Sequence, residues 1–295
     1  MLVFSGTSNK LLAARLAKAL KTRLGKIELS KFPNDEIRVW VTEKNVGKRA
    51  VVVQSLSHRT DNHLMQFCLI CDALKRKGVN KIIAVIPWMG YSKQDKAFRP
   101  GEPLSAQVVA KMLEVTQLTK IITYDLHKPE IARFFKTKVI NLSGRRVFRE
   151  YFKNKVDQNT VVVAPDEGAR NSSKRFAYDL KAHVAYIKKK RDLNTGKVTV
   201  RGISRSVAGK KILIKDDMIA TGSTLIEAAK FLKTQNVASI AVAATHHLYL
   251  PGVQEKLDQS GITNLVVTDT VEPKARSKKL TVVSVAEMIA KEIRN

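Results

Sequence analysis

The stretch KILIKDDMIATGSTL at residues 211–225 decides the fold prediction. Residues 211–215 alternate β-branched and apolar side chains, which is typical of a mostly buried parallel strand, and Asp216 and Asp217 follow at its expected end. Residues 220–224 are small and rich in hydroxyl groups, and residues 225–233 have the spacing of an amphipathic helix. The pattern therefore predicts a strand, a tight loop and a helix, as in an α/β protein.

This unit favours a ligand that carries both a phosphate and hydroxyl groups. Backbone N–H groups and the positive end of a helix form a concavity that suits a phosphate. Adjacent carboxylates repel a phosphate, but they accept hydrogen bonds from sugar hydroxyls. Ordinary helix capping also explains hydroxyl groups at a helix start. The two acids at the strand end favour the interpretation as a site, and a pentose phosphate fits both halves.

Strands and helices alternate through most of the chain. Strands are predicted at 1–6, 26–29, 37–41, 50–54, 81–86, 120–123, 160–164, 182–187, 198–201, 240–244, 264–268 and 280–283, and helices at 8–21, 60–77, 104–115, 170–179, 253–259 and 285–293. No Gly- or Ser-rich linker occurs near Gly144, where a short hinge is expected. The alternation on both sides of it predicts two similar α/β units.

Two more predicted strands end in polar side chains. One is followed by Tyr124-Asp125-Leu126-His127, and the other by Pro165-Asp166-Glu167-Gly168-Ala169. Ligands of open parallel sheets bind beyond the carboxyl ends of the strands, so these segments are candidate site residues. His127 is a candidate metal ligand or an oriented histidine, and a structural histidine is the alternative.

Three further segments have both a functional and an ordinary interpretation. Phe32, Asn34 and Glu36 offer a ring, an amide and a carboxylate for a base, or they form a plain hairpin turn. The long Pro- and Gly-rich loop that follows residue 86 contains Lys93-Gln94-Asp95, and loops of this length are usually functional or disordered. The basic run 188–191 is either a solvated hairpin or a movable clamp over transferring phosphates.

Composition limits the classes of protein that fit. The 53 Lys and Arg residues exceed the 26 Asp and Glu residues, which gives a formal charge of +27 that attracts anions. The cations are scattered and rarely interleaved with aromatic residues, so specific nucleic-acid binding is not expected. Cys68 and Cys71 are spaced one helical turn apart on an apolar face, which favours core positions over a redox or metal pair. No apolar run approaches the ~18 residues of a membrane span. We expect a cytoplasmic protein with no membrane partner.

The motifs occur in one order along the chain: Phe-x-Asn-x-Glu, Tyr-Ser-Lys-Gln-Asp, Tyr-Asp-Leu-His, Ala-Pro-Asp-x-Gly, Lys-x-Arg and Asp-Asp-Met-Ile-x-Thr-Gly-x-Thr. Each is weak alone, but the ordered set resembles the ribose-phosphate pyrophosphokinase (phosphoribosyl pyrophosphate synthetase) family. The last motif also resembles the phosphoribosyl-pyrophosphate loop of type I phosphoribosyltransferases. The resemblance implies two type I phosphoribosyltransferase domains, 1–143 and 144–283, each with a mainly parallel sheet flanked by helices. The final helix, 284–295, would pack back on the first domain.

The resemblance also implies residue roles. Phe32, Asn34 and Glu36 would hold the adenine of ATP bound by a neighbouring subunit, with Lys93, Gln94 and Asp95 on the other side. His127 and Asp166 match the positions that bind the Mg²⁺ of ATP, and Lys189 and Arg191 match the catalytic pair of the flexible loop. Ribose 5-phosphate would be bound by Asp216 and Asp217 through its hydroxyls and by Ala220, Thr221, Gly222, Ser223 and Thr224 through its phosphate. A homodimer or larger homo-oligomer follows from the shared ATP site.

The implied reaction passes the β,γ-diphosphoryl group of Mg-ATP to the anomeric hydroxyl of ribose 5-phosphate, which supplies nucleotide biosynthesis. Two positions depart from the family pattern, because Lys93 replaces an arginine and Ala220 replaces an acid. One alternative is a phosphoribosyltransferase, in which the first α/β unit would have no function. The other is a protein without enzyme activity, either an inactive relative that regulates an active synthetase or a nucleic-acid-binding protein on this fold.

Overall fold

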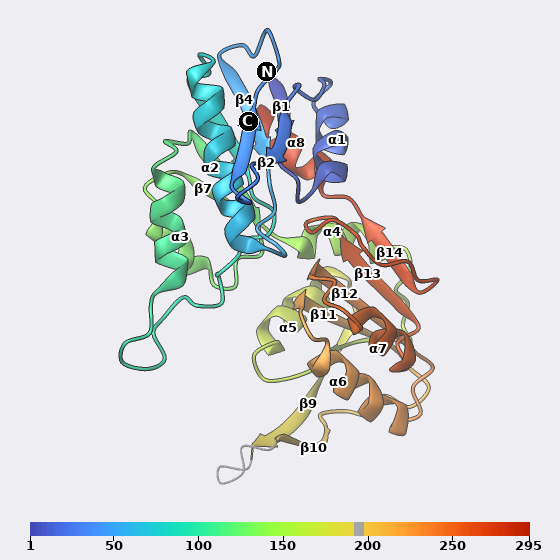
Figure 1. Cartoon of the computed structure of the whole chain (residues 1–295). Helices are drawn as coiled ribbons and strands as arrows, with labels where there is room; N and C mark the ends of the chain where they lie inside the picture. The colour runs from blue at the N-terminus through green and yellow to red at the C-terminus, as the bar shows by residue number, and fades with distance from the viewer. Residues whose placement is uncertain (192–197) are drawn as a thin grey trace. The chain divides into compact units, whose positions relative to one another are not determined.

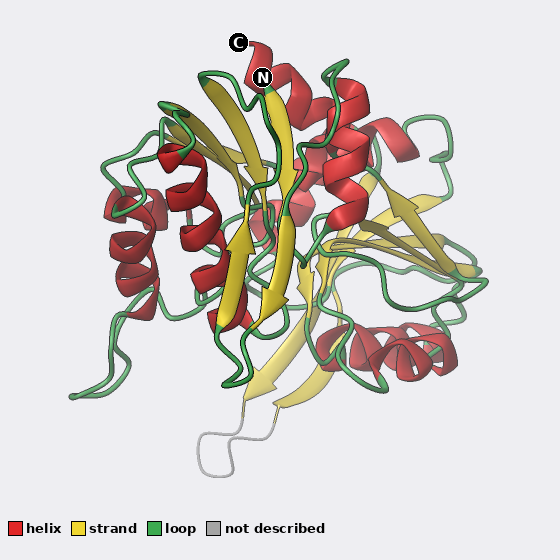
Figure 2. Cartoon of the chain, turned by 45° about the horizontal axis from the view of Figure 1, so that its top comes forward, coloured by secondary structure: helices red, strands yellow, loops and turns green. Residues whose placement is uncertain are grey.

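The structure is a computed structural model that describes residues 1–191 and 198–295. These residues form two compact units, each of which is described by itself. Unit 1 contains Met1–Ser143, Asp269–Glu272 and Ser284–Asn295, and unit 2 contains Gly144–Thr268 and Pro273–Val283. Each unit is built on its own mainly parallel sheet with helices beside it, as Figure 2 shows by colour. The α/β prediction is therefore confirmed.

Unit 1 is organised around a five-stranded parallel sheet. The strands, in spatial order, are β1 (Leu2–Ser5), β4 (Arg49–Val53), β5 (Lys81–Val85), β6 (Lys120–Tyr124) and β7 (Val139–Leu142). Alternate strand residues such as Val52 and Ala84 pack against α2 (Thr60–Arg76) and α3 (Ser105–Glu114). Two further helices of unit 1, α1 (Lys10–Ala19) and α8 (Ala286–Arg294), also have buried apolar faces. The sheet is thus covered by helices, as its continuous apolar strands require.

A hairpin and a short helix complete unit 1. Strands β2 (Glu28–Lys31) and β3 (Ile37–Trp40) pair antiparallel as a separate two-stranded sheet, and η1 (Pro129–Phe134) is a 3₁₀ helix that follows β6. The closing helix α8 is tied to this unit by hydrogen bonds from Lys120 Nζ to the Glu292 carbonyl and from Arg294 to the Ala19 carbonyl.

Unit 2 is organised around a seven-stranded sheet (Figure 1). In spatial order its strands are β10 (Val198–Ile203), β9 (His183–Arg191), β8 (Thr160–Ala164), β11 (Lys211–Ile219), β12 (Ser239–His247), β13 (Asn264–Thr268) and β14 (Leu280–Val283). β10 is antiparallel to β9, and the remaining neighbours are parallel. One face packs against α6 (Ser223–Thr234) and α7 (Val253–Gln259), and the other against α4 (Gly144–Phe152) and α5 (Arg170–Asp179).

The sequence-based elements are confirmed in type, but several differ in extent. The strands predicted at 182–187 and 240–244 continue to Arg191 and His247, so the basic run 188–191 lies within β9. The strand predicted to end at residue 215 continues to Ile219, so Asp216 and Asp217 lie within β11. Pairing with β12 extends the strand, because Asp216 lies opposite Ala244 and Ile219 opposite His247. The short β7 and the strongly basic α4 are absent from the sequence-based assignment.

The two cysteines also differ in their surroundings. Cys71 is fully buried in the core of unit 1, as expected, whereas Cys68 lies at the margin of that core. No helix in the described ranges has both the length and the apolar composition needed to cross a membrane.

Candidate active site

The topology of unit 2 has a switch point at the carboxyl ends of β8 and β11. From β8 the chain proceeds to β9 and β10 on one side, and it then returns to β11 on the other side. Loops that leave neighbouring parallel strands in opposite directions form the usual ligand-binding crevice of open α/β sheets. β11 pairs with β8 through Leu213, whereas its pairing with β12 continues to Ile219. The last part of β11 is therefore paired on one side, next to this switch point.

Asp216 and Asp217 lie on this part of β11. The backbone N–H of Asp217 donates a hydrogen bond to Oδ1 of Asp216 at 2.8 Å. Burial, reinforced by the neighbouring Asp217 carboxyl, raises the pKa of Asp216 to about 7. The two acids thus lie next to each other at the carboxyl edge of the sheet, where a ligand with hydroxyl groups can donate hydrogen bonds to them.

The loop after β11 leads directly into α6. Gly222 is the N-cap residue of α6 and has a φ of 72°, a left-handed conformation that glycine adopts without strain. The first intrahelical bond is donated by the N–H of Ile226 to the carbonyl of Gly222 at 2.9 Å, so the N–H groups of the first turn have no acceptor within the helix. The Thr221 and Ser223 hydroxyls lie 3.1 Å apart, and both residues are exposed. This geometry suits an anion at the start of a 12-residue helix.

A second loop begins where β8 ends. Asp166 is half-buried, and its Oδ1 accepts a hydrogen bond from the backbone N–H of Ala169 at 3.0 Å. Glu167 pairs with Arg170 at 2.8 Å, which anchors the loop to the first turn of α5. Asp166 and the pair on β11 therefore belong to the same carboxyl edge of one sheet, as the sequence predicts.

The predicted catalytic residues Lys189 and Arg191 lie on β9, which forms a hairpin with β10. The backbone register places Lys189 opposite Val200 and Arg191 opposite Val198. The side chains of both residues fall outside the part of the chain whose side chains the structure describes.

Unit 1 brings together two of the predicted nucleotide segments. Asp95 Oδ2 lies 3.0 Å from the Nζ of Lys128, which follows His127 directly. The hydrogen bond and charge of Lys128 lower the pKa of Asp95, and the charge of His127 acts in the same direction. Lys93 and Gln94 lie on the same loop as Asp95 and are exposed. Lys128 and His127 thus lie near the Asp95 carboxylate.

The other predicted nucleotide residues, Phe32, Asn34 and Glu36, lie on the turn between β2 and β3 and are exposed. The turn is closed by hydrogen bonds from the Phe32 N–H to the Glu36 carbonyl at 2.8 Å and from the Asp35 N–H to the Phe32 carbonyl at 2.9 Å. Among the described residues, no hydrogen bond or ion pair joins this hairpin to the loop that carries Asp95. The contacts of these side chains are local to the hairpin: Asn34 Oδ1 accepts the Glu36 N–H at 3.4 Å, and the Arg38 guanidinium lies 5.9 Å from the centre of the Phe32 ring.

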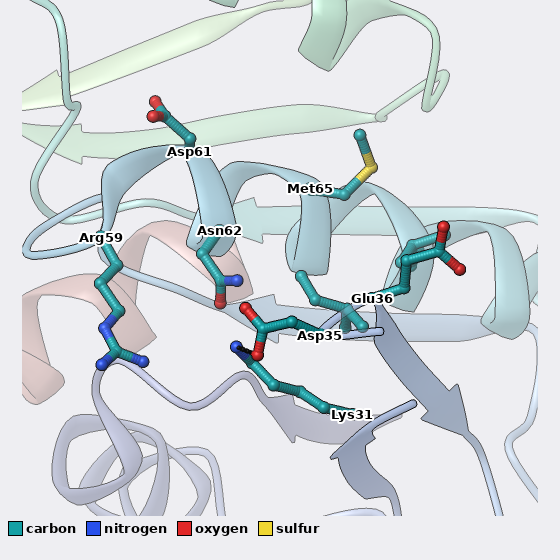
Figure 3. Close-up of a pocket in the computed structure, with 9 residues that line it drawn as sticks. Lys31, Asp35, Glu36, Arg59, Asp61, Asn62 and Met65 are labelled. Carbon is teal, nitrogen blue, oxygen red and sulfur yellow. Dashed lines mark hydrogen bonds and ion pairs between the residues drawn. The ribbon is translucent and has the colours of Figure 1, made fainter. Parts of the chain in front are cut away.

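A pocket of about 930 Å³ lies between this hairpin and the start of α2. Figure 3 shows Lys31, Asp35 and Glu36 on the hairpin side and Arg59, Asp61 and Asn62 on the helix side. Lys31 forms an ion pair with Asp35, and Asp61 accepts a hydrogen bond from the hydroxyl of Tyr91. Glu36 is the member of the predicted adenine set that lines this pocket.

In the described part of the chain, no three His, Cys, Asp or Glu side chains gather into a cluster suited to a metal ion. His127 belongs to unit 1 and Asp166 to unit 2. Each unit thus offers one of the two predicted ligands. Mg²⁺ is usually held by one or two side chains together with substrate phosphates.

Two residues of this region were missed by the sequence analysis. Lys128 forms an ion pair with Asp95. The available signal was its position directly after His127 in the sequence. Lys215 is a buried lysine in an apolar strand. The available signal was a charged residue directly after the apolar residues 212–214.

Comparison with known proteins gives matches over both units. The family model for the N-terminal domain of ribose phosphate pyrophosphokinase matches residues 1–116, and that for the phosphoribosyl transferase domain matches residues 134–272. The ribose-phosphate pyrophosphokinase of Helicobacter hepaticus is 34% identical over 292 residues, which cover 99% of this chain and 94% of that protein. The Sulfolobus acidocaldarius protein of the same name is 32% identical over 294 residues, with 99% and 100% covered.

A solved structure agrees with these matches. The phosphoribosylpyrophosphate synthetase from Mycobacterium smegmatis superposes with a TM-score of 0.90 at 32% identity, and the match covers 99% of this chain and 97% of that one. The similarity extends over nearly the whole length of both chains, so it includes both sheets and is not confined to a single motif.

Proposed function

Since the chain belongs to the ribose-phosphate pyrophosphokinase family, we propose that it transfers the β,γ-diphosphoryl group of Mg-ATP to the anomeric hydroxyl of ribose 5-phosphate. The products are 5-phosphoribosyl 1-diphosphate and AMP, and the enzyme supplies a precursor for nucleotide biosynthesis. The observation that carries the proposal is the combination, at one sheet edge, of the Asp216–Asp217 pair with the glycine-capped start of α6.

Ribose 5-phosphate fits this edge in one orientation. Its 5-phosphate accepts hydrogen bonds from the backbone and hydroxyl groups of residues 220–224, where the positive end of α6 favours an anion. Its ribose hydroxyls donate hydrogen bonds to the carboxylates of Asp216 and Asp217. The opposite orientation is disfavoured because these carboxylates would repel the phosphate. The Ala220 side chain contributes no acid to this loop, so proton handling by an acid at that position has no part in the proposal.

ATP is proposed to bind between subunits. Lys93, Gln94 and Asp95 of one copy would meet Phe32, Asn34 and Glu36 of another, and the exposure of all three hairpin residues supports this arrangement. An apolar surface between α2 and α3 also supports a homodimer or larger homo-oligomer, because Met65, Met112 and Val115 on it are 46%, 37% and 81% exposed. Apolar surface that clusters in this way is typical of interfaces.

We propose Mg²⁺ as the metal, held by His127 and Asp166 together with the phosphates of ATP. When bound, Mg²⁺ neutralises phosphate charge and orients the nucleotide. The chain's own contribution at these positions is one imidazole and one carboxylate, and the backbone N–H of Ala169 fixes the orientation of that carboxylate.

The transfer is an in-line displacement at the β-phosphorus of ATP. The anomeric oxygen of ribose 5-phosphate forms a bond to the β-phosphorus, the bond from that phosphorus to the α,β-bridging oxygen breaks, and AMP leaves with that oxygen. The hydroxyl proton is lost to solvent. Lys189 and Arg191 are proposed to neutralise the charge that develops on the β-phosphoryl and leaving oxygens, so catalysis relies on positioning and electrostatics.

The remaining parts of the proposal concern domains and location. Residues 1–143 with 284–295 and residues 144–283 are proposed as the two domains. The compact units support this division, although Asp269–Glu272 lie in unit 1. A cytoplasmic location is proposed from the enzyme's substrates and from two free cysteines, which are usual in a reducing compartment.

The test is whether AMP release from Mg-ATP requires ribose 5-phosphate. Lys189→Ala is expected to lower kcat about 10²–10³-fold, as loss of a preorganised cation does. Lys188→Ala is the matched control, because Lys188 is the exposed neighbour on the same strand. If ribose 5-phosphate binds but AMP never appears, the protein is a transferase or a regulator, and the proposal is wrong.

A further inference from the structure

The two helical layers that cover the sheet of unit 2 differ strongly in charge. Helices α4 and α5, each taken with the three residues that follow it, contain nine Lys and Arg residues and two Asp and Glu residues. Helices α6 and α7 on the opposite face of the sheet, counted in the same way, contain three of each. One layer is thus strongly positive, whereas the other has no net charge.

The outward face of α5 combines cations with an uncovered aromatic ring. Lys174, Arg175 and Tyr178 are exposed and lie within one turn of one another, on the side of the helix away from the buried Phe176. Lys181 follows directly after the helix and is also exposed. Tyr178 is 84% exposed, although tyrosine usually buries a large part of its ring. This face therefore presents a ring beside several positive charges.

Helix α4 packs beside α5 on the same side of the sheet. The ring centroids of Phe152 and Phe176 lie 6.5 Å apart, and Nε of Arg145 lies 3.3 Å from Oδ2 of Asp179. Both helices bury their apolar side chains in one core cluster against the sheet. Their polar faces therefore point away from the sheet and form one surface.

The part of this surface that α4 contributes is also basic. Arg146, Arg149 and Lys153 are exposed and recur at i, i+3 and i+7. Glu150 lies among them and is held by Arg149 at 2.9 Å and by Lys153 at 2.7 Å. Among the side chains that the structure describes, no carboxylate forms an ion pair with Arg146 or with the three exposed cations of α5 named above. These cations are available to an external anion.

We propose that this surface of unit 2 binds single-stranded nucleic acid without sequence preference. The surface, named the α4–α5 face, is formed by Arg146, Arg149, Lys153, Lys174, Arg175 and Tyr178. Its cations contact the phosphates of the strand, and an unpaired base stacks on the ring of Tyr178, which are the two kinds of contact that such binding uses. The proposal does not depend on the proposed function of the chain.

The exposed side chains favour a nucleic acid over an anionic membrane surface. Helices that lie on membranes insert several large apolar side chains between the lipids. In the described residues of α4 and α5, Tyr178 is the one large apolar or aromatic side chain that is strongly exposed. A single ring beside cations suits one unpaired base. The bases of a duplex are already stacked on one another, so a single strand is the better match.

The experiment measures the affinity of the full-length protein for a fluorescently labelled oligo(dT) of about 20 nucleotides by anisotropy, between about 50 and 200 mM salt. Lys174→Gln/Arg175→Gln removes two cations, Tyr178→Ala removes the ring, and Tyr178→Phe retains it. Lys230→Gln/Lys256→Gln is the matched control, because it removes two exposed cations from α6 and α7 on the opposite face. Thermal unfolding of each variant shows whether it is folded.

The proposal predicts a different effect for each kind of contact. Lys174→Gln/Arg175→Gln is expected to reduce the slope of log K against log salt by about 1.4, and to weaken binding about fivefold for each lost contact at about 100 mM salt. Tyr178→Ala is expected to weaken binding about fivefold or more with an unchanged slope, and Tyr178→Phe to retain most of the affinity. The control is expected to stay within about twofold of wild type.

Equal losses in Lys174→Gln/Arg175→Gln and in the control would overturn the proposal, because they would show that the strand is attracted only by the overall charge. Wild-type affinity in Tyr178→Ala would also overturn it. A third contradicting result is that the wild-type protein does not bind oligo(dT) at about 50 mM salt, whether or not it binds vesicles that contain an anionic phospholipid.

Discussion

Nζ of Lys128 lies 3.0 Å from Oδ2 of Asp95, and this ion pair joins the loop that carries Lys93 and Gln94 to the segment that follows β6. The Asp95 side chain is 11% exposed and the Lys128 side chain is 44% exposed. The pair therefore joins a half-buried carboxylate to a cation that is more exposed to solvent. It places the predicted nucleotide loop beside His127 within one unit.

Replacement of Lys128 by alanine is expected to raise the KM for ATP by up to about fivefold with a smaller change in kcat, because a partly exposed ion pair contributes up to about 1 kcal/mol. Steady-state kinetics with varied ATP measure this effect. Lys128→Arg is expected to retain most of the affinity. Lys111→Ala, at an exposed position on α3, is the matched control. An unchanged KM for ATP in Lys128→Ala would show that the pair does not position the loop.

Gly222 and Gly252 provide a second, closely matched comparison. Both are helix N-cap residues with a φ of 72°, but an added Cβ at Gly222 would lie 3.2 Å from Leu257, whereas at Gly252 it would meet nothing within 4 Å. Alanine at either position should lower the free energy of unfolding by about 1 kcal/mol through backbone strain. We expect only Gly222→Ala to raise the KM for ribose 5-phosphate as well. If the two variants changed that KM equally, the proposal that the loop before α6 binds the phosphate of ribose 5-phosphate would be contradicted.

His247 predicts how stability changes with pH. Its ring is stacked on Tyr249, its Nδ1 accepts the Tyr249 N–H at 2.9 Å, and its Nε2 lies 3.2 Å from Oε1 of Gln254. The ring is therefore neutral with the proton on Nε2, and burial lowers its pKa to about 4. In the unfolded chain His247 has a pKa near 6.5, so it binds a proton at a higher pH than in the folded chain. The free energy of unfolding is therefore at its full value above pH 6.5 and decreases as the pH falls toward 4.

Urea denaturation at several pH values measures this effect. The contribution of His247 is expected to have a slope of up to about 1.4 kcal/mol per pH unit between pH 6.5 and pH 4. Other groups titrate in this range, so the slope of wild type is compared with that of His247→Gln, which keeps a polar side chain. Identical slopes would show that the protonation of His247 is not linked to folding.

Asp269 anchors the returning segment of unit 1. It is fully buried, its Oδ2 pairs with Arg15 at 2.7 Å, and its Oδ1 accepts the Val285 N–H at 2.9 Å. Asp269→Asn is expected to lower the free energy of unfolding by about 2–3 kcal/mol, because hydrogen bonds to a charged group are lost or weakened in a buried site. Asp72→Asn, which breaks the exposed pair with Arg76, should cost less than about 0.5 kcal/mol. Similar losses in both variants would contradict this role of Asp269.

The sequence predicted the strands and helices best where hydrophobic periodicity was strong. β4, β5, β8 and β13 are continuous apolar runs and were assigned almost to the residue. β7 is a half-buried strand of four residues at the edge of its sheet, and its run Val-Ile-Asn-Leu is too short to identify a strand by periodicity. α4 has a strongly basic face opposite the buried Val147, Phe148 and Phe152, so its periodicity was present in the sequence, but the helix begins at Gly144, where a hinge was expected.

The site shows a different limit of sequence reasoning. Two acids in a row suggested that the strand had ended, but the partner strand β12 extends β11 through them, and pairing of this kind is a tertiary effect. The family and fold class followed from the order of motifs and are confirmed by the comparisons. The ion pair between Lys128 and Asp95 joins segments that are far apart in the sequence, so neither periodicity nor spacing contains it.

The most direct test of the central claim follows the phosphorus atoms of ATP by ³¹P NMR during reaction with Mg²⁺ and ribose 5-phosphate. We predict that the β- and γ-phosphorus signals convert together into a diphosphate on C1 of the sugar, while the α-phosphorus signal becomes that of AMP in equal amount. Formation of ADP with a sugar that has gained a single phosphate, or conversion of ATP at the same rate without the sugar, would contradict diphosphoryl transfer.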